Sequence, residues 1–519
     1  MNQSKQWDAI VIGSGLGGLS AAARFANSGK CVLVLERNAS FGGAATVYRH
    51  GALTTEASLH ETDGDTIFGP NSAFASLGLS IEVEAITTDV FYEARGGVLK
   101  MPIQIPVDLD NALSALRKHL PTSRTNLDSY FNKLQQLYQT LHQLENMGSA
   151  RFSTLLSLLF SGRLFALVAD SRRTLAEKFD GFFADDEAAK FALGAPISYF
   201  DDDPRKLSFL LFAGVWSRYV ESGSYYFKGG SGALTTALLK HVTNAGGEVR
   251  TNANVTQILV DEKEKAVGVE YVDADGNQEV VQALNIFSGI APTQMTDMLP
   301  ESRRAKFAKN YVNFELSISL FNISIGLVRP ASEFGVAAYS TFVYPDDMTK
   351  FLDYPHHAAV FGKHPAGTMP PYVIADYGRL DTGLRRPLDP YSVAITGVDR
   401  ISWWEGLSEA EVKMRKKCWL DAIIADVDRR YPGLAAAITQ SEISIAQTMK
   451  SHLGTPLGAV YGFRPTPSRL FGRLPSAATS IRGLWLSSAY TMSGGYAGAL
   501  QGGLLAANAA LKSKLALPA

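Results

Sequence analysis

Residues 8–43 read DAIVIGSGLGGLSAAARFANSGKCVLVLERNASFGG, and this stretch decides the fold. An apolar run from Asp8 to Ile12 leads into a glycine-rich turn. An Ala-rich stretch, Leu19 to Ala26, and a second apolar run, Cys31 to Leu35, follow it. This order predicts strand, tight turn, helix and strand, which is a βαβ unit with two parallel strands. The expected fold class is therefore α/β.

The turn contains Gly13, Gly15 and Gly18 in the pattern G-x-G-x-x-G. The first glycine permits the tight turn, the second lets backbone contact a pyrophosphate, and the third lets helix and strand pack closely. Glu36 ends the second strand, 18 residues after Gly18, where a carboxylate accepts hydrogen bonds from ribose hydroxyls. We predict a dinucleotide site rather than an ordinary glycine-rich turn. An acidic residue would repel a ribose 2′-phosphate, which argues against NADP as the primary nucleotide.

Three further segments accompany this unit. Arg37, Gly42, Gly43 and Ala44 follow Glu36 in the pattern E-R-x-x-x-x-G-G-A. The stretch YYFKGGSG, residues 225–232, opens a predicted helix over 233–244, and a predicted strand begins at Val255. A short strand over 484–486 leads into the glycine-rich segment SSAYTMSGGYAGALQGG. Glycines this dense at a strand-to-helix junction let backbone approach a flat ligand closely.

Together these segments resemble the FAD-dependent family of phytoene desaturases, carotenoid isomerases and retinol saturases, within the amine-oxidase-like flavoproteins. In that family the double glycine lies against the flavin, the arginine helps to hold the pyrophosphate, and the strand at Val255 meets the adenine. No cysteine lies near the C-terminal glycines, so the resemblance implies non-covalent FAD. It assigns the cofactor to Gly13, Gly15, Leu16, Gly17, Gly18, Glu36, Arg37, Gly42, Gly43, Ala44, Val255, Ser488, Gly495, Tyr496 and Ala497.

The resemblance also implies a domain organisation. We expect a discontinuous, glutathione-reductase-type FAD-binding Rossmann-like domain. It takes in residues 1–75, 225–300 and 455–519. Residues 76–224 and 301–454 then form an α+β substrate domain.

Three side chains are candidates for catalysis. His60 could deliver a proton beside the flavin, because an ordinary imidazole titrates near neutral pH; a satisfied loop histidine is the alternative. Glu56 could act as a base, or could hold cofactor or backbone by hydrogen bonds. Tyr496 could line the flavin face or simply pack near the helix start. The stretch TEASLH, residues 55–60, and Ser488 depart from the family pattern, which usually has glycine at these places.

Composition excludes several function classes. Lys+Arg number 49 and Asp+Glu 50, so no excess of positive charge favours a nucleic-acid partner. Two cysteines exclude a disulfide framework or an iron–sulfur cluster built from this chain. Asp353, His356 and His357 are interpreted as solvated residues in a Pro-rich loop, and no metal site is expected. The sequence has no G-x-S-x-G, Walker or H-E-x-x-H motif, so hydrolases and phosphotransferases are not indicated.

The apolar segment over 152–169, flanked by Arg151, Arg172 and Arg173, has two interpretations. It lies in a membrane interface, or it is a buried helix or the lid of an apolar cavity. It is too short and interrupted for a confident transmembrane helix. We expect a cytoplasmic protein, with peripheral contact at the cytoplasmic face of a membrane under the first interpretation.

The expected function is FAD-dependent desaturation, saturation or redox-assisted isomerisation of C=C bonds in an apolar polyene or isoprenoid, such as a carotenoid or retinoid. NAD(P)H is expected at most as a transient reductant, since no second G-x-G-x-x-G follows a strand. One alternative is an oxidoreductase or isomerase of fatty acyl or polyketide chains. Another is a non-catalytic escort protein that binds prenyl lipids. The sequence leaves the electron partner open.

Overall fold

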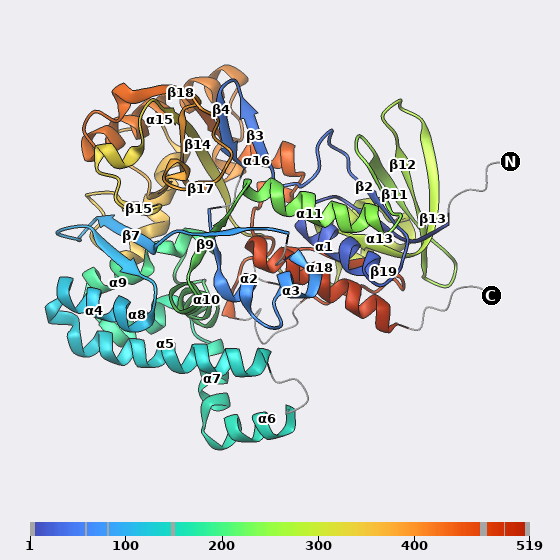
Figure 1. Cartoon of the computed structure of the whole chain (residues 1–519), viewed down its shortest axis with the longest axis horizontal. Coiled ribbons are helices and arrows are strands. Elements are labelled where there is room, and N and C mark those ends of the chain that lie inside the picture. The colour runs from blue at the N-terminus through green and yellow to red at the C-terminus, as the bar shows by residue number, and fades with distance from the viewer. Residues whose placement is uncertain are drawn as a thin grey trace.

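The computed structural model describes residues 6–57, 60–79, 82–146, 151–467, 475–492 and 494–513. Ser58 and Leu59, in the stretch that departs from the family pattern, lie outside these ranges, as do the side chains of residues 151–154 and 156. Figure 1 shows one sheet on the right, a second sheet at the upper left and a layer of helices below it.

The predicted βαβ unit is confirmed and forms the centre of the first sheet, in which β1 pairs in parallel with β2 and β13. β10 and β19 extend the parallel part, and β11 and β12 form an antiparallel hairpin against the other half of β13. The strands are β10 (Glu248–Arg250), β2 (Val32–Leu35), β1 (Trp7–Ile12), β13 (Gln278–Ser288), β12 (Ala266–Val272), β11 (Asn254–Val260) and β19 (Leu484–Leu486).

Alternation along the strands explains how this sheet is covered on both faces. Ala9 and Val11 of β1 belong to the core with α1 (Leu16–Ala26), α11 (Gly230–Asn244) and α18 (Gly495–Lys512). Ile10 and Ile12 point the other way, into a core with the hairpin, α12 (Pro292–Met298) and α13 (Glu301–Ala308). Parallel strands buried on both faces read as continuous apolar runs, as they do here. The α/β fold class is confirmed.

The second sheet is antiparallel apart from the pairing of β15 with β7. Phe321 and Ile323 of β14 pack with Trp419 of α15 (Glu409–Arg430), whereas Asn322 and Ser324 face a cavity between the two sheets. Its strand order is β18 (Ile438–Ser444), β14 (Ser319–Leu327), β17 (Tyr391–Asp399), β16 (Tyr372–Ala375), β15 (Ser340–Tyr344), β7 (Val90–Gly96) and β8 (Ile103–Pro106).

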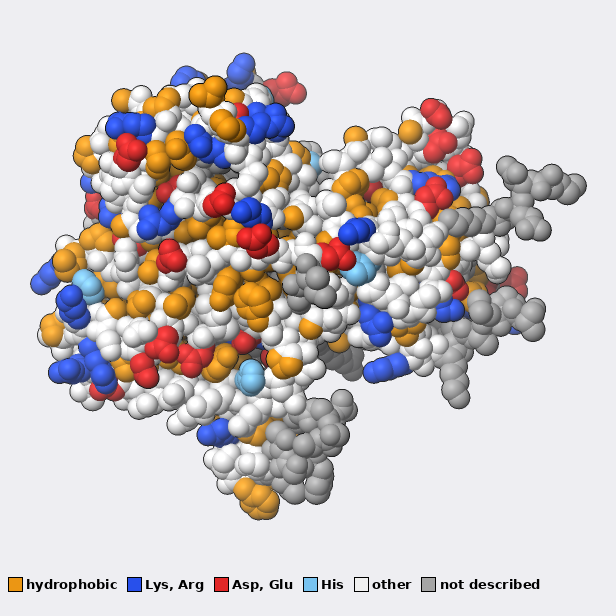
Figure 2. All heavy atoms as spheres, viewed as in Figure 1, with side chains coloured by type: hydrophobic (Ala, Val, Ile, Leu, Met, Phe, Trp, Pro, Cys, Tyr) orange, Lys and Arg blue, Asp and Glu red, His pale blue; other side chains and the backbone are white. Residues whose placement is uncertain are grey.

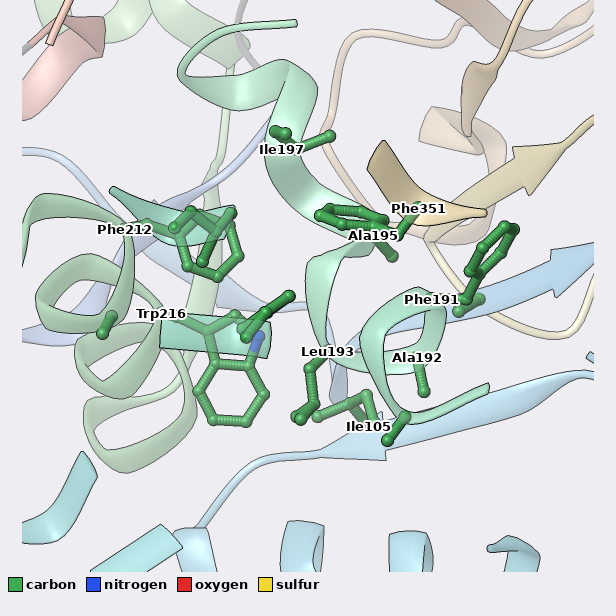
Figure 3. Packing of buried hydrophobic residues seen from close by; sticks show 14 of the residues in the cluster. Ile105, Phe191, Ala192, Leu193, Ala195, Ile197, Phe212, Trp216 and Phe351 are labelled. Carbon is green, nitrogen blue, oxygen red and sulfur yellow. The ribbon is translucent and has the colours of Figure 1, made fainter. Parts of the chain in front are cut away.

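The helical layer is built on a large apolar core. Figure 3 shows part of it, with Phe191 and Leu193 of α9 and Phe212 and Trp216 of α10. The Trp216 indole N–H donates to the Tyr92 hydroxyl at 3.1 Å, so this buried polar atom is satisfied. The helices are α4 (Leu109–His119), α5 (Arg124–Glu145), α6 (Arg151–Phe160), α7 (Arg163–Ser171), α8 (Leu175–Phe183), α9 (Glu187–Gly194) and α10 (Phe209–Ser222).

Smaller elements join these layers. The strands β3 (Val47–His50) and β4 (Leu53–Glu56) form a hairpin, and β9 (Ser224–Phe227) lies between β5 (Thr62–Asp63) and β6 (Ala85–Thr87). The remaining α-helices in the described ranges are α2 (Gly64–Phe68), α3 (Ala73–Leu77), α14 (Tyr354–Ala358) and α16 (Ala446–Leu453). The division into an FAD domain and a substrate domain stays a prediction.

Candidate flavin and substrate site

A cavity of about 1020 Å³ opens where the parallel strands of the first sheet end. The carboxyl ends of parallel strands meet at one edge of a sheet, which is where α/β proteins bind ligands. Here Gly13 follows β1, Glu36 follows β2, Gly289 follows β13 and Ser488 lies just beyond β19, and all four line the cavity. The cavity continues to β14 and β17 of the second sheet, which contribute Asn322 and Thr396.

The glycines of the first turn serve different purposes. Gly13 has φ +86°, a conformation that favours glycine, and a Cβ on Gly18 would lie 2.2 Å from the Gly13 carbonyl oxygen. A Cβ on Gly17 would lie 2.3 Å from the Ser487 carbonyl oxygen. A Cβ on Gly15 would meet no described atom within 4 Å and would project into open space. Gly17 and Gly18 therefore permit packing, whereas Gly15 keeps the turn clear for a ligand.

Glu36 is buried and its carboxylate organises the turn. One oxygen accepts hydrogen bonds from the Ser14 backbone N–H at 2.9 Å and the Ser14 hydroxyl at 2.6 Å. The other oxygen accepts from the Asn38 backbone N–H at 2.9 Å. A carboxylate offers about four acceptor positions, so capacity remains for a ribose hydroxyl.

Arg37 lines the same cavity, but its hydrogen bonds go elsewhere. Its guanidinium donates to the carbonyl oxygens of Ser451 and His452, at 2.9 and 3.1 Å, at the C-terminal end of α16. The arginine thus holds α16 beside the nucleotide end of the cavity. Contact between Arg37 and a pyrophosphate stays a prediction.

The double glycine lies directly against the first turn. Gly43 has φ +59°, and a Cβ there would lie 3.2 Å from the Gly15 Cα. Ala44 follows, and its carbonyl oxygen accepts a hydrogen bond from the Tyr496 hydroxyl at 3.0 Å. From the sequence, Tyr496 was expected either to line the flavin face or to pack near the helix start. In the structure it lines the cavity, and its hydrogen bond to Ala44 holds the double-glycine loop.

Two helices begin at the cavity without side-chain caps. α1 follows Gly15 and α18 follows Gly494, and neither N-cap residue makes a side-chain cap. Uncapped helix N-termini present free backbone N–H groups that favour anions such as phosphate. Leu16, Gly17, Val255, Gly495 and Ala497 line the cavity as predicted for the cofactor set, whereas Gly18 packs behind it.

These features fit FAD. The open space at Gly15 and the uncapped N-termini suit a pyrophosphate. Among the described residues, the buried Ser488 hydroxyl finds no hydrogen-bond partner, and Ser488 lines the cavity beside Gly17 at the start of α1. A buried hydroxyl without a partner is costly, which indicates a polar ligand group at this point.

Glu56 lines the cavity, and its side chain also contacts the start of α11. Its carboxylate accepts hydrogen bonds from the Tyr226 hydroxyl at 2.7 Å, the Ser231 backbone N–H at 3.0 Å and the Ser231 hydroxyl. Burial raises the pKa of Glu56 to about 7, against the opposing effect of these hydrogen bonds. The contacts tie β4 to α11, which is the hydrogen-bonding alternative that the sequence left open.

His60 lies deeper in the cavity, beside Thr396, whose hydroxyl is 3.3 Å from its Nε2. Burial lowers the pKa of His60 to about 4, because a charged imidazolium would lose its hydration. The imidazole is therefore neutral at pH 7. His60 was considered as a proton donor because an ordinary histidine titrates near neutral pH, and the lowered pKa of His60 contradicts that premise. Its catalytic role stays a prediction.

Sequence reasoning missed several residues of the deep end. Glu61 follows His60 in the chain, and Tyr199 belongs to a distant segment, but both line the same cavity. The wall beside them is apolar. It is formed by Phe200, Leu211, Val215, Leu320 and Val373. The position of Glu61 next to His60 was the one feature of the sequence that could have identified it as a site residue. No sequence motif near Tyr199 indicated that it belongs to the site.

Of the three residues interpreted as solvated, His356 is exposed and Asp353 is half-buried, whereas His357 is not solvated. His357 is buried, and its ring faces the Asp353 carbonyl oxygen at 3.2 Å, so the interpretation as a solvated residue is wrong for His357. The physical reason is that residues 354–358 form a helical turn whose inner side packs on the core. Within the described ranges, no group of three His, Cys, Asp or Glu residues could hold a metal ion.

Comparison with known proteins agrees with this geometry. The family described as "Flavin containing amine oxidoreductase" matches residues 16–283, slightly more than half of the chain. A chloroplastic prolycopene isomerase from Daucus carota is 25% identical over 93% of this chain and 76% of its own length. An all-trans-retinol 13,14-reductase from Danio rerio is 24% identical over 99% of this chain and 87% of its own.

Solved structures share the fold. An oxidoreductase from Methanosarcina mazei superposes with a TM-score of 0.62 at 15% identity, covering 97% of this chain and 100% of its own. Cyclohexylamine oxidase from Brevibacterium oxydans gives 0.60 at 14% identity, covering 98% and 99%. The family match, the glycine-lined turn and the two open helix N-termini lead to one conclusion: this chain is an FAD-dependent oxidoreductase that belongs to the flavin containing amine oxidoreductase family.

Proposed function

We propose that this enzyme saturates or isomerises C=C bonds of an apolar polyene of the carotenoid or retinoid class. The observation that carries the proposal is the apolar wall at the deep end of the cavity, formed by Phe200, Leu211, Val215, Leu320 and Val373. This wall is continuous with the turns that hold the cofactor. Apolar surface beside a flavin binds a hydrocarbon chain and excludes water from the reaction.

The curated relatives support the same substrate class. Both the prolycopene isomerase and the retinol reductase match nearly the whole chain, including the parts outside the nucleotide-binding sheet. Their names describe an isomerisation and a reduction of polyenes. Bound FAD supplies hydride exchange, while the protein binds and orients the substrate and controls protons.

The test is an anaerobic absorbance titration of the purified holoenzyme with NADPH and with NADH, followed by addition of retinol or prolycopene. We expect the oxidised-flavin bands to bleach on reduction. If the enzyme saturates the polyene, the bands return when the polyene is added and chromatography shows a saturated product; if it isomerises the polyene, which is redox-neutral, the bands stay bleached and an isomerised product appears. Cyclohexylamine and an unsaturated fatty acid serve as competing substrates. Oxidation of the amine, turnover of the fatty acid alone, or flavin-free protein that still binds prenyl chains would overturn the proposal.

We further propose that the protein contacts a membrane from the cytoplasm through the helical hairpin α6–α7. The hairpin projects from the helical layer in Figure 1, and Figure 2 shows hydrophobic side chains at the tip of the projection. Phe160 is 85% exposed and Phe165 67% exposed, with Arg172 and Arg173 close in sequence. Exposed aromatic side chains beside arginines suit an interface with anionic lipid. The low cysteine content supports a reducing compartment.

Liposome flotation tests this second proposal. We expect the wild type to float with vesicles that contain anionic lipid, and F160D together with F165D to stay in solution. Val312→Asp is the matched control, because Val312 is 70% exposed and lies elsewhere on the surface. Equal flotation of all three proteins would contradict the proposal. In the described part of the chain, no helix is long and apolar enough to cross a bilayer.

A further inference from the structure

Glu61 is a buried carboxyl group on the cavity wall, surrounded by hydroxyl groups. One oxygen accepts hydrogen bonds from the Tyr199 hydroxyl at 2.9 Å and the Ser340 hydroxyl at 3.0 Å. The other oxygen accepts from the Ser224 hydroxyl. These side-chain partners, all within the described residues, are neutral. A carboxyl group in this setting changes its protonation state more readily than one that is paired with a cation.

Burial raises the pKa of Glu61 to about 7, although the three hydroxyl hydrogen bonds act in the opposite direction. Other titratable groups pack around it. The Tyr219 hydroxyl donates to the Glu61 backbone oxygen at 3.0 Å, the Tyr339 hydroxyl donates to the His60 backbone oxygen, and the neutral His60 ring is the neighbour in the chain. Neither phenol contacts the Glu61 carboxyl, so Tyr199 is the phenol that shares a proton with it.

Tyr199 lines the cavity next to this carboxyl group, to which its hydroxyl is hydrogen-bonded. It is partly exposed, lines the cavity, and contacts the His60 ring with centroids 5.8 Å apart. When Glu61 is neutral, its O–H can donate to the Tyr199 oxygen, which frees the phenol O–H to turn toward the cavity. No rearrangement of the backbone is needed for this exchange.

Saturation of a double bond requires one hydride and one proton at adjacent carbons. His60 is neutral at pH 7, so it is not an imidazolium that gives up a proton, and the Glu56 carboxyl group is bound to Tyr226 and to Ser231 at the start of α11. We propose that Tyr199 donates the proton to a substrate carbon and that Glu61 replaces it. This inference rests on the proposed polyene reduction.

The step balances as follows. A bound flavin, reduced by an NAD(P)H-type reductant, would supply the hydride to one carbon. The C=C π bond, the bond that carried the hydride and the Tyr199 O–H bond break, and two C–H bonds form. The Glu61 O–H proton passes to the Tyr199 oxygen, and the carboxylate regains a proton from solvent afterwards. Tyr199 is thus a catalytic residue, and Glu61 acts through it as a positioning and proton-supplying residue.

Reoxidation of the dithionite-reduced holoenzyme by retinol, followed by anaerobic stopped-flow absorbance, tests the pair. We expect Y199F and E61Q each to slow reoxidation about 100-fold or more, the range of general acid catalysis. FAD content, the rate of dithionite reduction and retinol binding should stay unchanged. E61D should recover part of the rate because it restores an exchangeable carboxyl proton.

Y339F is the matched control, because Tyr339 is a neighbouring buried phenol whose hydroxyl meets a backbone oxygen instead of the Glu61 carboxyl. S340A is a milder variant that keeps the pair but removes one donor to Glu61. It should move the midpoint of the pH–rate profile upward, since that hydrogen bond lowers the pKa of Glu61. Wild-type rates in Y199F would refute the proposal that Tyr199 and Glu61 deliver the proton, without contradicting the proposed activity on polyenes.

Infrared spectroscopy supplies a readout that does not depend on turnover. The protonated-carboxyl band that E61Q removes should decrease as pH rises through about 7. A Glu61 that is ionised throughout pH 5–9 would overturn the pair even if retinol is reduced. Wild-type enzyme that neither reduces nor isomerises a polyene, with the carboxyl band titrating as expected, would instead overturn the proposed function.

Discussion

The Ser14 hydroxyl donates to the Glu36 carboxylate at 2.6 Å and also accepts a hydrogen bond from the Gly42 backbone N–H at 3.1 Å. One small side chain therefore connects the turn after β1, the end of β2 and the double-glycine loop. These three segments contribute different parts of the cofactor site. Their relative positions depend on a hydrogen-bond network that is buried from water.

Glu36→Ala should weaken FAD retention. The substitution removes the acceptor for Ser14 and for ribose hydroxyls, and lost hydrogen bonds of this kind cost on the order of 1–3 kcal/mol. Flavin absorbance after extensive dialysis measures the effect. Glu262→Ala is the control, because Glu262 is exposed in the turn between β11 and β12. Equal flavin occupancy in E36A and wild type would contradict the assignment.

Gly15→Ala and Gly503→Ala should separate cofactor binding from folding. A Cβ on Gly503 would lie 2.2 Å from the Gly17 carbonyl oxygen, in the contact between α1 and α18. We expect G503A to lower the melting temperature of both apo and holo protein, since overpacking costs about 1–3 kcal/mol. G15A should leave the apo melting temperature unchanged and lose FAD, because its methyl group projects into the cavity. Normal FAD occupancy in G15A would argue that no pyrophosphate approaches this turn.

His60→Asn should change how stability depends on pH. The pKa of His60 is lowered from 6.5 to about 4 in the folded protein, so the unfolded chain binds a proton more readily between these values. The contribution of His60 to the free energy of unfolding is therefore highest above pH 6.5 and falls as the pH is lowered toward 4. At 1.36 kcal/mol per pH unit, this contribution falls by up to about 3 kcal/mol.

Urea unfolding of wild type and H60N at pH 7.5 and pH 5 measures this difference. The contributions of Glu56 and Glu61 have the opposite sign, because raised carboxyl pKa values make stability fall as pH rises from 4.5 to about 7. They are common to both proteins and cancel in the comparison. Identical pH dependence in the two proteins would show that His60 titrates normally in the fold.

Arg464→Met should destabilise the protein strongly. The buried Arg464 guanidinium donates to Asp201 at 2.6 and 3.0 Å and to Asp202 at 3.0 Å, joining the segment before α10 to the C-terminal part of the chain. Removing one partner of a buried pair leaves uncompensated charge and costs about 3–5 kcal/mol.

Chemical denaturation of R464M measures this loss. The exposed pair Lys417–Asp421 provides the control, and K417M should change stability by less than about 1 kcal/mol. Comparable losses in the two variants would contradict the idea that burial sets the cost. Partial recovery is expected in R464M with Asp201→Asn, since that change removes the carboxylate that loses its cation, whereas Asp202 keeps its ion pair with Arg400.

The local pattern of apolar residues and glycines was sufficient to predict the nucleotide-binding βαβ unit. Apolar runs around a G-x-G-x-x-G turn predicted β1, α1 and β2, and the C-terminal run at Leu484 predicted β19. These features depend on spacing within a few residues, because strand alternation and a tight turn are properties of short segments. FAD was implied by the family resemblance, which rested on this unit together with the later glycine-rich segments, and the family match confirms it.

The apolar segment over 152–169 was ambiguous for a physical reason. A buried helix and a helix at a membrane surface require the same composition, so only packing distinguishes them. The structure divides the segment into α6 and α7 around Gly162 and leaves Phe160 and Phe165 exposed. This arrangement removes the buried-lid interpretation for those two side chains.

The βαβ unit, its glycine-rich turn and the acidic residue at the end of β2 could be predicted from the sequence alone, since each depends on the spacing of residues within a short segment. Only the tertiary structure decided what surrounds His60, Glu61 and Tyr199. Tyr199, Ser224 and Ser340 converge on one carboxyl group from separate segments, and burial there changes the proton affinity of each acid and base. Protonation depends on hydration and on distant partners, and neither is encoded in local spacing.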